Sequence, residues 1–472
     1  MKEELPESTK RLRRVGAAIF LTLALIGGLL IWQVDLFHLH FGYRDAKEEY
    51  LRSGMPWTSE DLYKDITPEQ AEMRAELVKT ANLALKDSEL DYEHRYDQVT
   101  KANALKRLQQ LSRISPHLDK MMALSDAPLH GLIDVNKGFN SSSLPLGEMK
   151  RAVQLLALRG QWKVTSGQFA DGRKDLESAY SLAKSFGKSE TFIGYFMGHS
   201  SFSSVDASVI KAASALKGNQ AQLASLEKLL VESHSLDLSP KNALRGEALM
   251  HIAYTRNADV LKEVSTSIFQ DAFPGAMTRQ SIDSGDPRSI GRRSLAVPFL
   301  ELWAEVGESM KNAPDDQKKW FDALRRGVSK AMKRGRITAS LVEFFTVYPD
   351  RVLDNLKSYK TLRLVNLSLL RGTRMKLEGR SRGEIEAAME IDPYSGQPLV
   401  WKSTGSTFTV WSVGPNGADD GGISRADYRK LMGSAGTRAG GVEPYDVPAT
   451  IPWKPEPKPS STGASHLSGE DR

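Results

Sequence analysis

The feature that most constrains this chain is an uncharged apolar run near its N-terminus, Val15–Val34. Within these residues only Thr22 and Gln33 are polar. A helix of this length rises about 30 Å, which matches the hydrocarbon core of a bilayer. The run therefore predicts a single transmembrane helix, and membrane lipid is the first partner that we expect.

Charge on the two sides of the run predicts its orientation. Basic residues precede it, at Lys10, Arg11, Arg13 and Arg14. Because positive charge favours the cytoplasmic side, residues 1–14 are expected inside and the rest in the periplasm, on the outer side of the inner membrane. A cleaved signal peptide is the alternative. It would need a shorter apolar core and a small-residue cleavage site, and neither is present, so we favour an uncleaved signal anchor.

The composition fits a globular protein that follows the anchor. Of the 472 residues, 40% are hydrophobic and 26% are charged, which is ordinary for a packed domain. The net charge of +6 is small for this length, and no nucleic-acid partner is expected. The chain has no cysteine, which excludes disulfides, thiol nucleophiles and iron–sulfur ligation.

A helical pattern dominates residues 68–378. Apolar residues recur at three- and four-residue steps from Ala71 onward, and Thr67 and Pro68 predict the N-cap and first turn of the first helix. Residues 35–67, between the anchor and this pattern, are predicted to form a membrane-proximal segment. We therefore predict a mainly α protein with an extracytoplasmic helical domain.

The clearest helical pair spans residues 151–187. Its two apolar stripes lie on either side of Gly167, and small residues occur at Gly167, Ala170 and Ala179, where the helices are expected to cross. The pair resembles a tetratricopeptide-type helix pair, although there is one copy rather than an array. A generic helical hairpin within an irregular bundle is the alternative.

The pattern changes after Gly379. Two β-branched and aromatic segments, 398–402 and 407–413, predict a β-hairpin inside a module that spans residues 379–445. Residues 446–472 are rich in proline and are predicted to be a disordered tail.

The hairpin carries a local signature. The turn DPYSGQPL begins at Asp392, and WSVGPNGADDGG begins at Trp411. This end, residues 392–422, resembles the calcium-loop hairpin of type II secretion major pseudopilins, although the N-terminal methylation segment of those proteins is absent. The resemblance implies a calcium site, and here its ligands would be Asn416, Asp419 and Asp420.

The chemistry of the loop allows two interpretations. Calcium takes six to eight oxygen ligands, which these three side chains and the carbonyl groups of a glycine-rich loop supply in part. The pseudopilin pattern has a further acidic residue where this chain has Gly421–Ser424, so one carboxylate is missing. The alternative is a tight turn in which the aspartates accept hydrogen bonds from backbone N–H groups.

The order of parts also resembles a family of uncharacterised membrane-anchored helical proteins that are common in planctomycetes. The shared parts are a basic N-terminus, one membrane helix, a Gly-x-Pro-x-Thr segment at Gly54, a helical middle and the C-terminal signature. No established activity comes with this resemblance.

Catalytic residues stay unknown. His38 and His40 lie at the expected membrane exit, and Ser181–Lys184 fits S-x-x-K inside a helix without the motifs that accompany it in enzymes. A basic cluster, which comprises Arg325, Arg326, Lys330, Lys333, Arg334 and Arg336, is predicted to be the solvated face of an amphipathic helix. A phospholipid or nucleic-acid surface is the alternative for this cluster.

These features favour a binding or scaffold protein that meets a protein partner in the cell envelope. Two alternatives stay open. One is a component of a secretion or pilus-like apparatus, and the other is an envelope hydrolase with unidentified catalytic residues.

Overall fold

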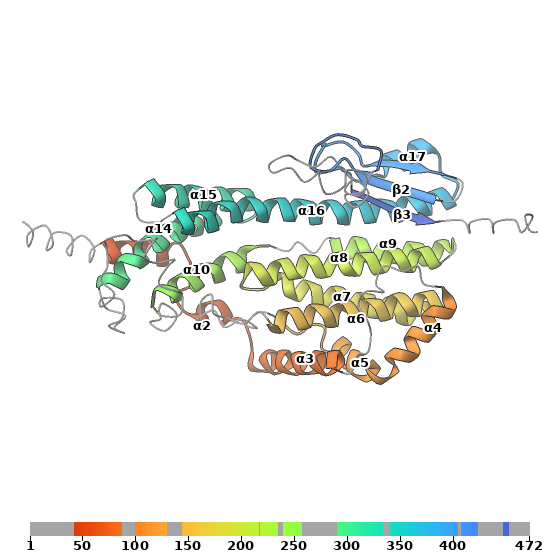
Figure 1. The fold of residues 1–472 in the computed structure, drawn as a ribbon, viewed down its shortest axis with the longest axis horizontal. Coiled ribbons are helices and arrows are strands. Elements are labelled where there is room, and N and C mark those ends of the chain that lie inside the picture. The colour runs from red at the N-terminus through yellow and green to blue at the C-terminus, as the bar shows by residue number, and fades with distance from the viewer. Residues whose placement is uncertain are drawn as a thin grey trace, which may run out of the picture. The chain divides into compact units, whose positions relative to one another are not determined.

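The computed structural model describes residues 42–86, 100–129, 144–216, 218–234, 239–256, 290–333, 339–404, 407–422 and 447–452. The chain is mainly helical with one small antiparallel sheet of three strands, which confirms the predicted class (Figure 1). The predicted anchor Val15–Val34 lies outside these ranges. No helix within them is both long and apolar enough to cross a membrane.

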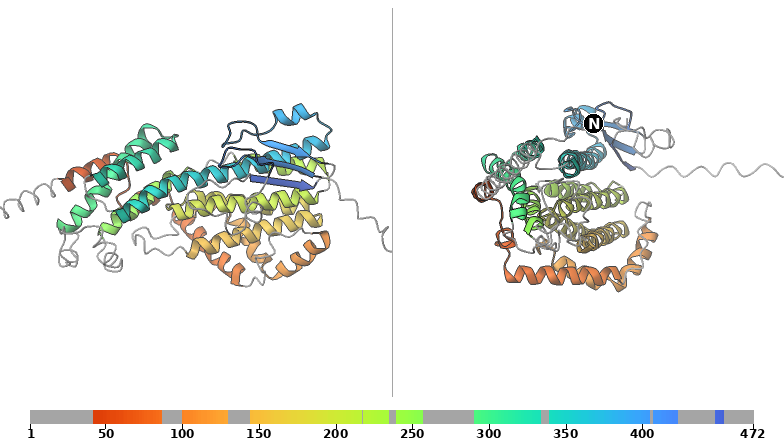
Figure 2. Two further views of the ribbon diagram at one scale, coloured as in Figure 1. Left: turned by 45° about the horizontal axis from the view of Figure 1, so that its top comes forward. Right: turned by 60° about the vertical axis from the view of Figure 1, so that its left-hand side comes forward.

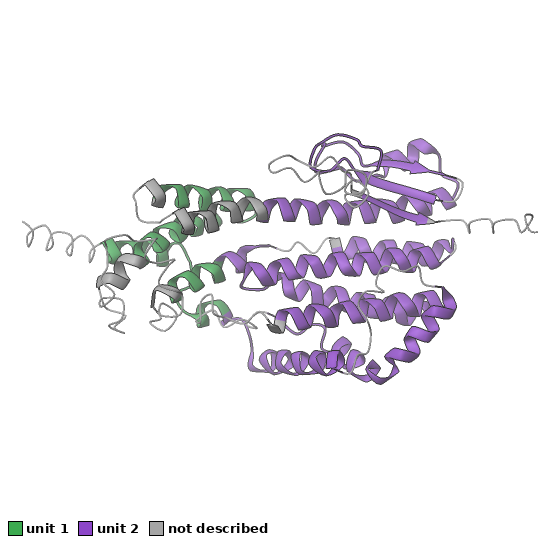
Figure 3. Cartoon of the chain, viewed as in Figure 1, with its two compact units in different colours: residues 1–62, 134–141, 245–350 green, residues 63–133, 142–244, 351–472 purple. Residues whose placement is uncertain are grey.

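The chain divides into two compact units (Figure 3). Unit 1 comprises residues 1–62, 134–141 and 245–350, and unit 2 comprises residues 63–133, 142–244 and 351–472. This division differs from the boundaries that we drew from the sequence. The predicted helical domain 68–378 contributes to both units, and the C-terminal module belongs to unit 2.

Unit 1 is built on a helical hairpin. Its described elements are the helical residues 42–52, α2 (Ser59–Tyr63), most of α10 (Lys241–Arg256), α14 (Ile290–Asn312), α15 (Gln317–Lys333) and the start of α16 (Ala339–Leu377). Helices α14 and α15 pack closely because Gly327 has no side chain where Leu302 of α14 lies. The buried indole of Trp303 and the rings of Phe299 and Phe321 fill this core.

Residues 42–62 belong to the same unit. Ser53 and Met55 lie against Gly307 of α14, where a larger residue would displace them. Tyr50 is fully buried, and its hydroxyl donates a hydrogen bond to the carbonyl of Pro56 at 2.5 Å. These contacts fasten residues 50–56 to the α14–α15 hairpin.

The predicted helix start at Thr67 and Pro68 is confirmed. Thr67 Oγ1 accepts from the backbone N–H of Gln70 at 3.3 Å, and the Gln70 side chain accepts from the N–H of Thr67 at 3.1 Å. This reciprocal pair is a capping box, and Pro68 occupies the first helical position. At α2, Asp61 accepts from the N–H groups of Trp57 and Thr58.

Unit 2 is a stack of helical layers beneath the sheet (Figure 2). Its elements are α3 (Pro68–Lys86), α4 (Lys101–Gln110), the short 3-10 turn η2 (Leu111–Arg113), α5 (Ser115–Ala123), α6 (Leu144–Ser166), α7 (Phe169–Gly187), α8 (Phe192–Ala215), α9 (Gln220–His234), the C-terminal part of α16, α17 (Arg382–Ala387), β1 (Val400–Ser403), β2 (Thr407–Ser412) and β3 (Val447–Pro452). Helices α6, α7 and α8 contact one another, and α3 and α4 both contact α6. Figures 1 and 2 both show α3–α5 on one side of the α6–α7 layer and α8 on the other.

The helical pair predicted around Gly167 is present as α6 and α7, but different glycines make its crossing. A Cβ on Gly172 would lie 2.6 Å from the carbonyl oxygen of Gly160, and one on Gly160 would lie 2.8 Å from that of Gly172. Gly167 instead forms the turn, with φ of 101°, and a Cβ there would meet nothing within 4 Å. Ala179 is buried as expected, whereas Ala170 is exposed.

The sheet has β2 at its centre. β1 pairs with it antiparallel with Val400 opposite Trp411, and β3 pairs on the other side with Val447 opposite Ser412. The prediction of a disordered tail over 446–472 was wrong for residues 447–452, which form β3, and the rest of the tail lies outside the described residues. Ala449 and Ile451 alternate with the polar Thr450, which is the pattern expected of a half-buried edge strand. Pro448 and Pro452 lie near the ends of the strand, where a missing N–H donor is tolerated.

The glycine crossing of α6 and α7 yields a stability prediction. We expect Gly172→Ala to lower the free energy of unfolding by about 2 kcal/mol, because the new methyl group would overlap backbone atoms of α6 that cannot rotate away. The matched control is Gly147→Ala in the partner helix α6, where a Cβ would meet nothing within 4 Å. That variant should gain about 0.5–1 kcal/mol from helix propensity. Urea unfolding followed by circular dichroism measures both, and equal effects would contradict the crossing.

Candidate functional site

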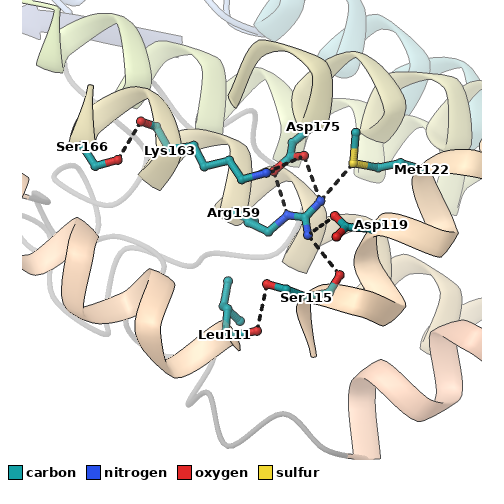
Figure 4. Close-up of polar contacts among 8 residues, drawn as sticks. All are labelled: Leu111, Ser115, Asp119, Met122, Arg159, Lys163, Ser166 and Asp175. Atoms are coloured by element: carbon teal, nitrogen blue, oxygen red, sulfur yellow. Dashed lines mark hydrogen bonds and ion pairs between the residues drawn. The ribbon is translucent and has the colours of Figure 1, made fainter. Parts of the chain in front are cut away.

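A buried ion pair joins the helices of unit 2 (Figure 4). Arg159 of α6 binds Asp175 of α7 through two nitrogens, Nε at 2.7 Å and Nη2 at 2.9 Å, and both side chains are almost fully buried. The guanidinium also reaches Asp119 of α5 at 2.7 Å. A bidentate ion pair of this kind fixes the relative position of the two helices that carry it. Removing one partner of a buried pair costs about 3–5 kcal/mol, because the other charge stays buried.

A second charged contact binds α9 to α16 and to the C-terminal module. Glu227 of α9 accepts from Arg371 Nε at 3.1 Å and from Arg374 Nε at 2.7 Å. Arg371 also donates to the carbonyl of Ala388 and to Glu390, just after α17. The Glu227 carboxylate thus binds both arginines. Through Arg371 it also positions residues 388–390, which lead into the sheet.

A third polar contact lies in the interior, between α7, α8 and α16. The hydroxyl of Tyr180 donates to Asp206 Oδ1 at 2.5 Å, and Arg363 Nε lies 3.9 Å from Asp206 Oδ2. The guanidinium of Arg363 lies over the ring of Phe202, 4.6 Å from its centroid. Burial raises the pKa of the Tyr180 hydroxyl well above its usual range, and the negative charge of Asp206 adds to this effect. Tyr180 therefore stays a hydrogen-bond donor at neutral pH.

His199 lies beside this group and is uncharged at neutral pH. Its ring stacks on Tyr359, with 5.6 Å between ring centroids, and meets the edge of Tyr195. Burial lowers the pKa of His199 to about 4, and the positive charge of Arg363 contributes. The imidazole is thus held in its neutral form.

A cavity of about 420 Å³ opens between α7 and α9, and Tyr180 forms part of its wall. Its polar lining consists of Ser125, Asp126, Glu177, Ser178, Ser181, Lys184, Glu232 and Ser233. Ser181 Oγ donates to Asp126 Oδ1 at 3.0 Å. The S-x-x-K residues therefore line a hollow, but the serine hydroxyl is directed to a carboxylate. The lining itself carries three carboxylates and one lysine, so its own side chains are net negative. Two of these carboxylates have ion-pair partners outside the lining, Glu177 with Arg173 at 3.4 Å and Glu232 with Lys228 at 3.7 Å.

A smaller groove of about 250 Å³ lies between α6 and α8, and serines form most of its α8 wall. The hydroxyls of Ser204 and Ser208 donate to backbone carbonyls one turn earlier on their own helix, at 3.0 Å and 3.2 Å. Gln154 of α6 donates to Ser204 at 3.1 Å. Because the hydroxyl hydrogens are used internally, the serines present mainly acceptor oxygens to the groove.

The three predicted calcium ligands lie together in the turn after β2, joined by hydrogen bonds. Asp419 Oδ1 accepts from Trp411 Nε1 at 2.8 Å and from the N–H of Gly421 at 3.0 Å. Asn416 Nδ2 donates to Asp420 Oδ2 at 2.8 Å. This arrangement agrees with the tight-turn interpretation, and the calcium site stays a prediction. Within the described residues, no group of three or more acidic, histidine or cysteine side chains could hold a metal ion.

Asp392 connects the parts of this module. It is the first residue of the DPYSGQPL turn, and the sequence predicted no separate role for it. Its carboxylate is buried and accepts four hydrogen bonds, from Ser412 Oγ, Val413 N–H, Tyr394 N–H and Ser395 Oγ. These donors come from the turn after Asp392 and from the end of β2. The position of the aspartate directly before Pro393 and three residues before Ser395 was the available signal, since such residues accept from nearby backbone N–H groups.

The structure also shows where several other residues considered in the sequence lie. Arg326 and Lys330 are exposed on α15, while Trp320 and Phe321 are buried beneath them, which confirms an amphipathic helix. Glu247 is buried in α10. His38, His40 and Arg334 to Arg336 lie outside the described residues.

Comparison with protein family models, with curated proteins and with solved structures found no match for this chain. The resemblances to pseudopilins, to tetratricopeptide pairs and to planctomycete membrane proteins therefore stay predictions.

The turn after β2 predicts how an aspartate variant responds to calcium. If Asp419 acts as a hydrogen-bond acceptor, Asp419→Ala will lower the unfolding temperature equally with and without calcium, because Trp411 and Gly421 lose their acceptor. Thermal unfolding and calorimetry of the full chain measure this. Heat on adding calcium to the natural chain, lost in Asp419→Ala, would instead establish the calcium site.

The buried histidine predicts a loss of stability in mild acid. The pKa of His199 is about 4 when folded and near 6.5 when unfolded, so its contribution is present above pH 6.5 and is lost as the pH falls toward 4. Between pH 7.5 and 5.5 this loss is about 1 kcal/mol. His199→Phe keeps a ring against Tyr359 and removes the titration.

The measurement is the difference between the two pH values in the free energy of urea unfolding. It should be about 1 kcal/mol smaller for His199→Phe than for the natural chain. His251, whose pKa burial lowers to about 3, titrates in both proteins and cancels in this difference. An unchanged pH dependence would contradict a neutral His199.

Proposed function

We propose that this protein is a membrane-anchored binding or scaffold protein of the cell envelope. Val15–Val34 provides the anchor, and the helical body is presented on the outer side of the inner membrane. The observation that carries the proposal is the negatively lined cavity between α7 and α9, in a body whose buried charges are used to join helices.

The charged contacts that join helices support a binding role. Arg159 and Asp175 join α6 to α7, and Glu227 holds two arginines of α16. Tyr180, which lines the cavity, is itself fixed from behind by Asp206. Side chains held in this way present a preorganised surface, which reduces the ordering cost of binding.

The lining indicates the chemistry of the partner. Asp126, Glu177 and Glu232 offer acceptors and negative charge, and Lys184 is the single basic residue among the lining side chains. We therefore propose that the partner inserts a basic or donor-rich polar segment. The cavity is open to the surface of unit 2, so a side chain or loop of another protein can reach it.

The first test determines where the chain is located in the cell and how it is oriented in the membrane. A C-terminal alkaline phosphatase fusion, which is active only outside the cytoplasm, should be active in cells, and the protein should stay with the membrane after alkaline washing. An inactive fusion would contradict the orientation that Val15–Val34 and its basic flank predict.

The cavity predicts a position-specific cross-link. A photoreactive residue in place of Ser178, which lines the cavity, should capture a partner in the envelope. The same residue at Ala224, exposed on α9 outside the lining, should not. Glu177→Lys with Glu232→Lys should reduce capture at least tenfold, because two attractive charges become repulsive.

Two results would contradict this proposal. Equal capture at Ser178 and Ala224 would show non-specific contact rather than binding at the cavity. Capture that the charge reversal leaves unchanged would exclude the acidic lining as the binding surface. Identification of the captured protein as a secretion subunit would favour the secretion-apparatus alternative.

A further inference from the structure

Unit 1 carries a helix with one strongly basic face. On α15, Trp320, Phe321, Leu324 and Val328 are buried against the unit. The opposite face is exposed at Lys318, Lys319, Arg326, Ser329 and Lys330, and Arg325 lies half-buried at its margin. The helix holds six basic residues and one acidic residue, Asp322. We call the exposed side of this helix the basic face.

Carboxylates nearby neutralise part of the basic face. Arg325 pairs with Asp322 at 2.6 Å, Lys319 with Asp316 at 3.2 Å, and Arg326 with Glu305 at 3.1 Å. Within the part of the chain that the structure describes, Lys318 and Lys330 form no ion pair. Exposed pairs of this kind bind weakly and exchange readily, so their basic members can also turn to another anion.

The basic face belongs to the same compact unit as the chain that leaves the predicted anchor. Ser53 and Met55 lie against Gly307 of α14, and α14 packs on α15 where Leu302 meets Gly327. The described residues begin at Gly42, eight positions after Val34. Even fully extended, that stretch spans at most about 28 Å. If Val15–Val34 crosses a membrane, residue 42 is therefore held within that distance of its surface.

We propose that the basic face of α15 binds the anionic phospholipid headgroups of the membrane that holds the anchor. The inference rests on the proposed anchor and adds a second contact with the same bilayer. Lysine and arginine are attracted to an anionic surface over about one Debye length, roughly 8 Å at physiological ionic strength. Tethering raises the effective concentration of the surface, so a modest number of charges is sufficient.

The competing ligand for such a face is nucleic acid. The anchor favours lipid, because it would tether the compact unit that carries the face to a bilayer. Contact with lipid would also hold unit 1 in a fixed orientation at the membrane, and this contact would weaken with salt.

The absence of native cysteine allows a direct test. A fluorophore is attached to Ser329→Cys, which is exposed on the basic face and leaves every charge in place. The labelled full chain is reconstituted in nanodiscs that contain nitroxide-headgroup lipid, with phosphatidylcholine alone or mixed with phosphatidylglycerol. A label at Ala224→Cys, exposed on α9, is the control.

We expect quenching at position 329 to be several-fold stronger with phosphatidylglycerol than without it, and to fall as salt is added. Lys318→Glu with Lys330→Glu should abolish this difference, whereas Lys228→Glu on α9 should not change it. Quenching that is independent of phosphatidylglycerol, equally dependent on it at position 224, or retained in Lys318→Glu with Lys330→Glu would overturn the inference.

Two further readouts separate the possible failures. Release of the full chain by alkaline washing would overturn the anchor and with it the proposed function. Firm anchoring without quenching would overturn the lipid contact alone. A response of the label to duplex DNA as strong as that to phosphatidylglycerol would assign the face to nucleic acid and overturn the lipid assignment.

Discussion

The ion pair between Arg159 and Asp175 is the interaction on which the helical body of unit 2 depends. Neither charge can be buried alone at acceptable cost, so the two must meet, and they can meet only when α6 and α7 are in one register. The glycine crossing at Gly160 and Gly172 brings the helix backbones close enough for this pairing. Hydrophobic packing supplies the driving force for burial, and the ion pair selects among the ways in which the helices could pack.

Further polar contacts connect the other helices of unit 2 to one another and to the C-terminal module. Asp119 connects α5 to Arg159, Glu227 connects α9 to α16, and Arg371 passes the connection to the C-terminal module. Each link uses a charged group that is at least partly withdrawn from water and is satisfied by a different helix. The cavity between α7 and α9 therefore has walls that are fixed on several sides, which is the physical basis for treating it as a recognition site.

Local chemistry could be predicted from the sequence, and partners distant in the chain could not. The cap at Thr67, the helical periodicity and the hairpin strands depend on neighbours within a few residues, so they were correctly anticipated. Periodicity identifies which face of a helix is buried but not what lies against it. Tyr180, Asp206 and Arg363 meet across three helices, and no spacing in the sequence indicates this. The crossing was misplaced to Gly167 because a glycine in a turn and a glycine at a contact look alike in sequence.

The third strand has a consequence for how the C-terminal module assembles. β1 and β2 are close in sequence and can pair early, whereas β3 joins β2 only after residues 413–446 have been closed into a loop. Closing such a loop costs entropy before any strand pairing compensates for it, so β3 should dock late in folding. Because β3 also contacts α8, its docking covers the edge of β2 and connects the sheet to the helical layers in the same step.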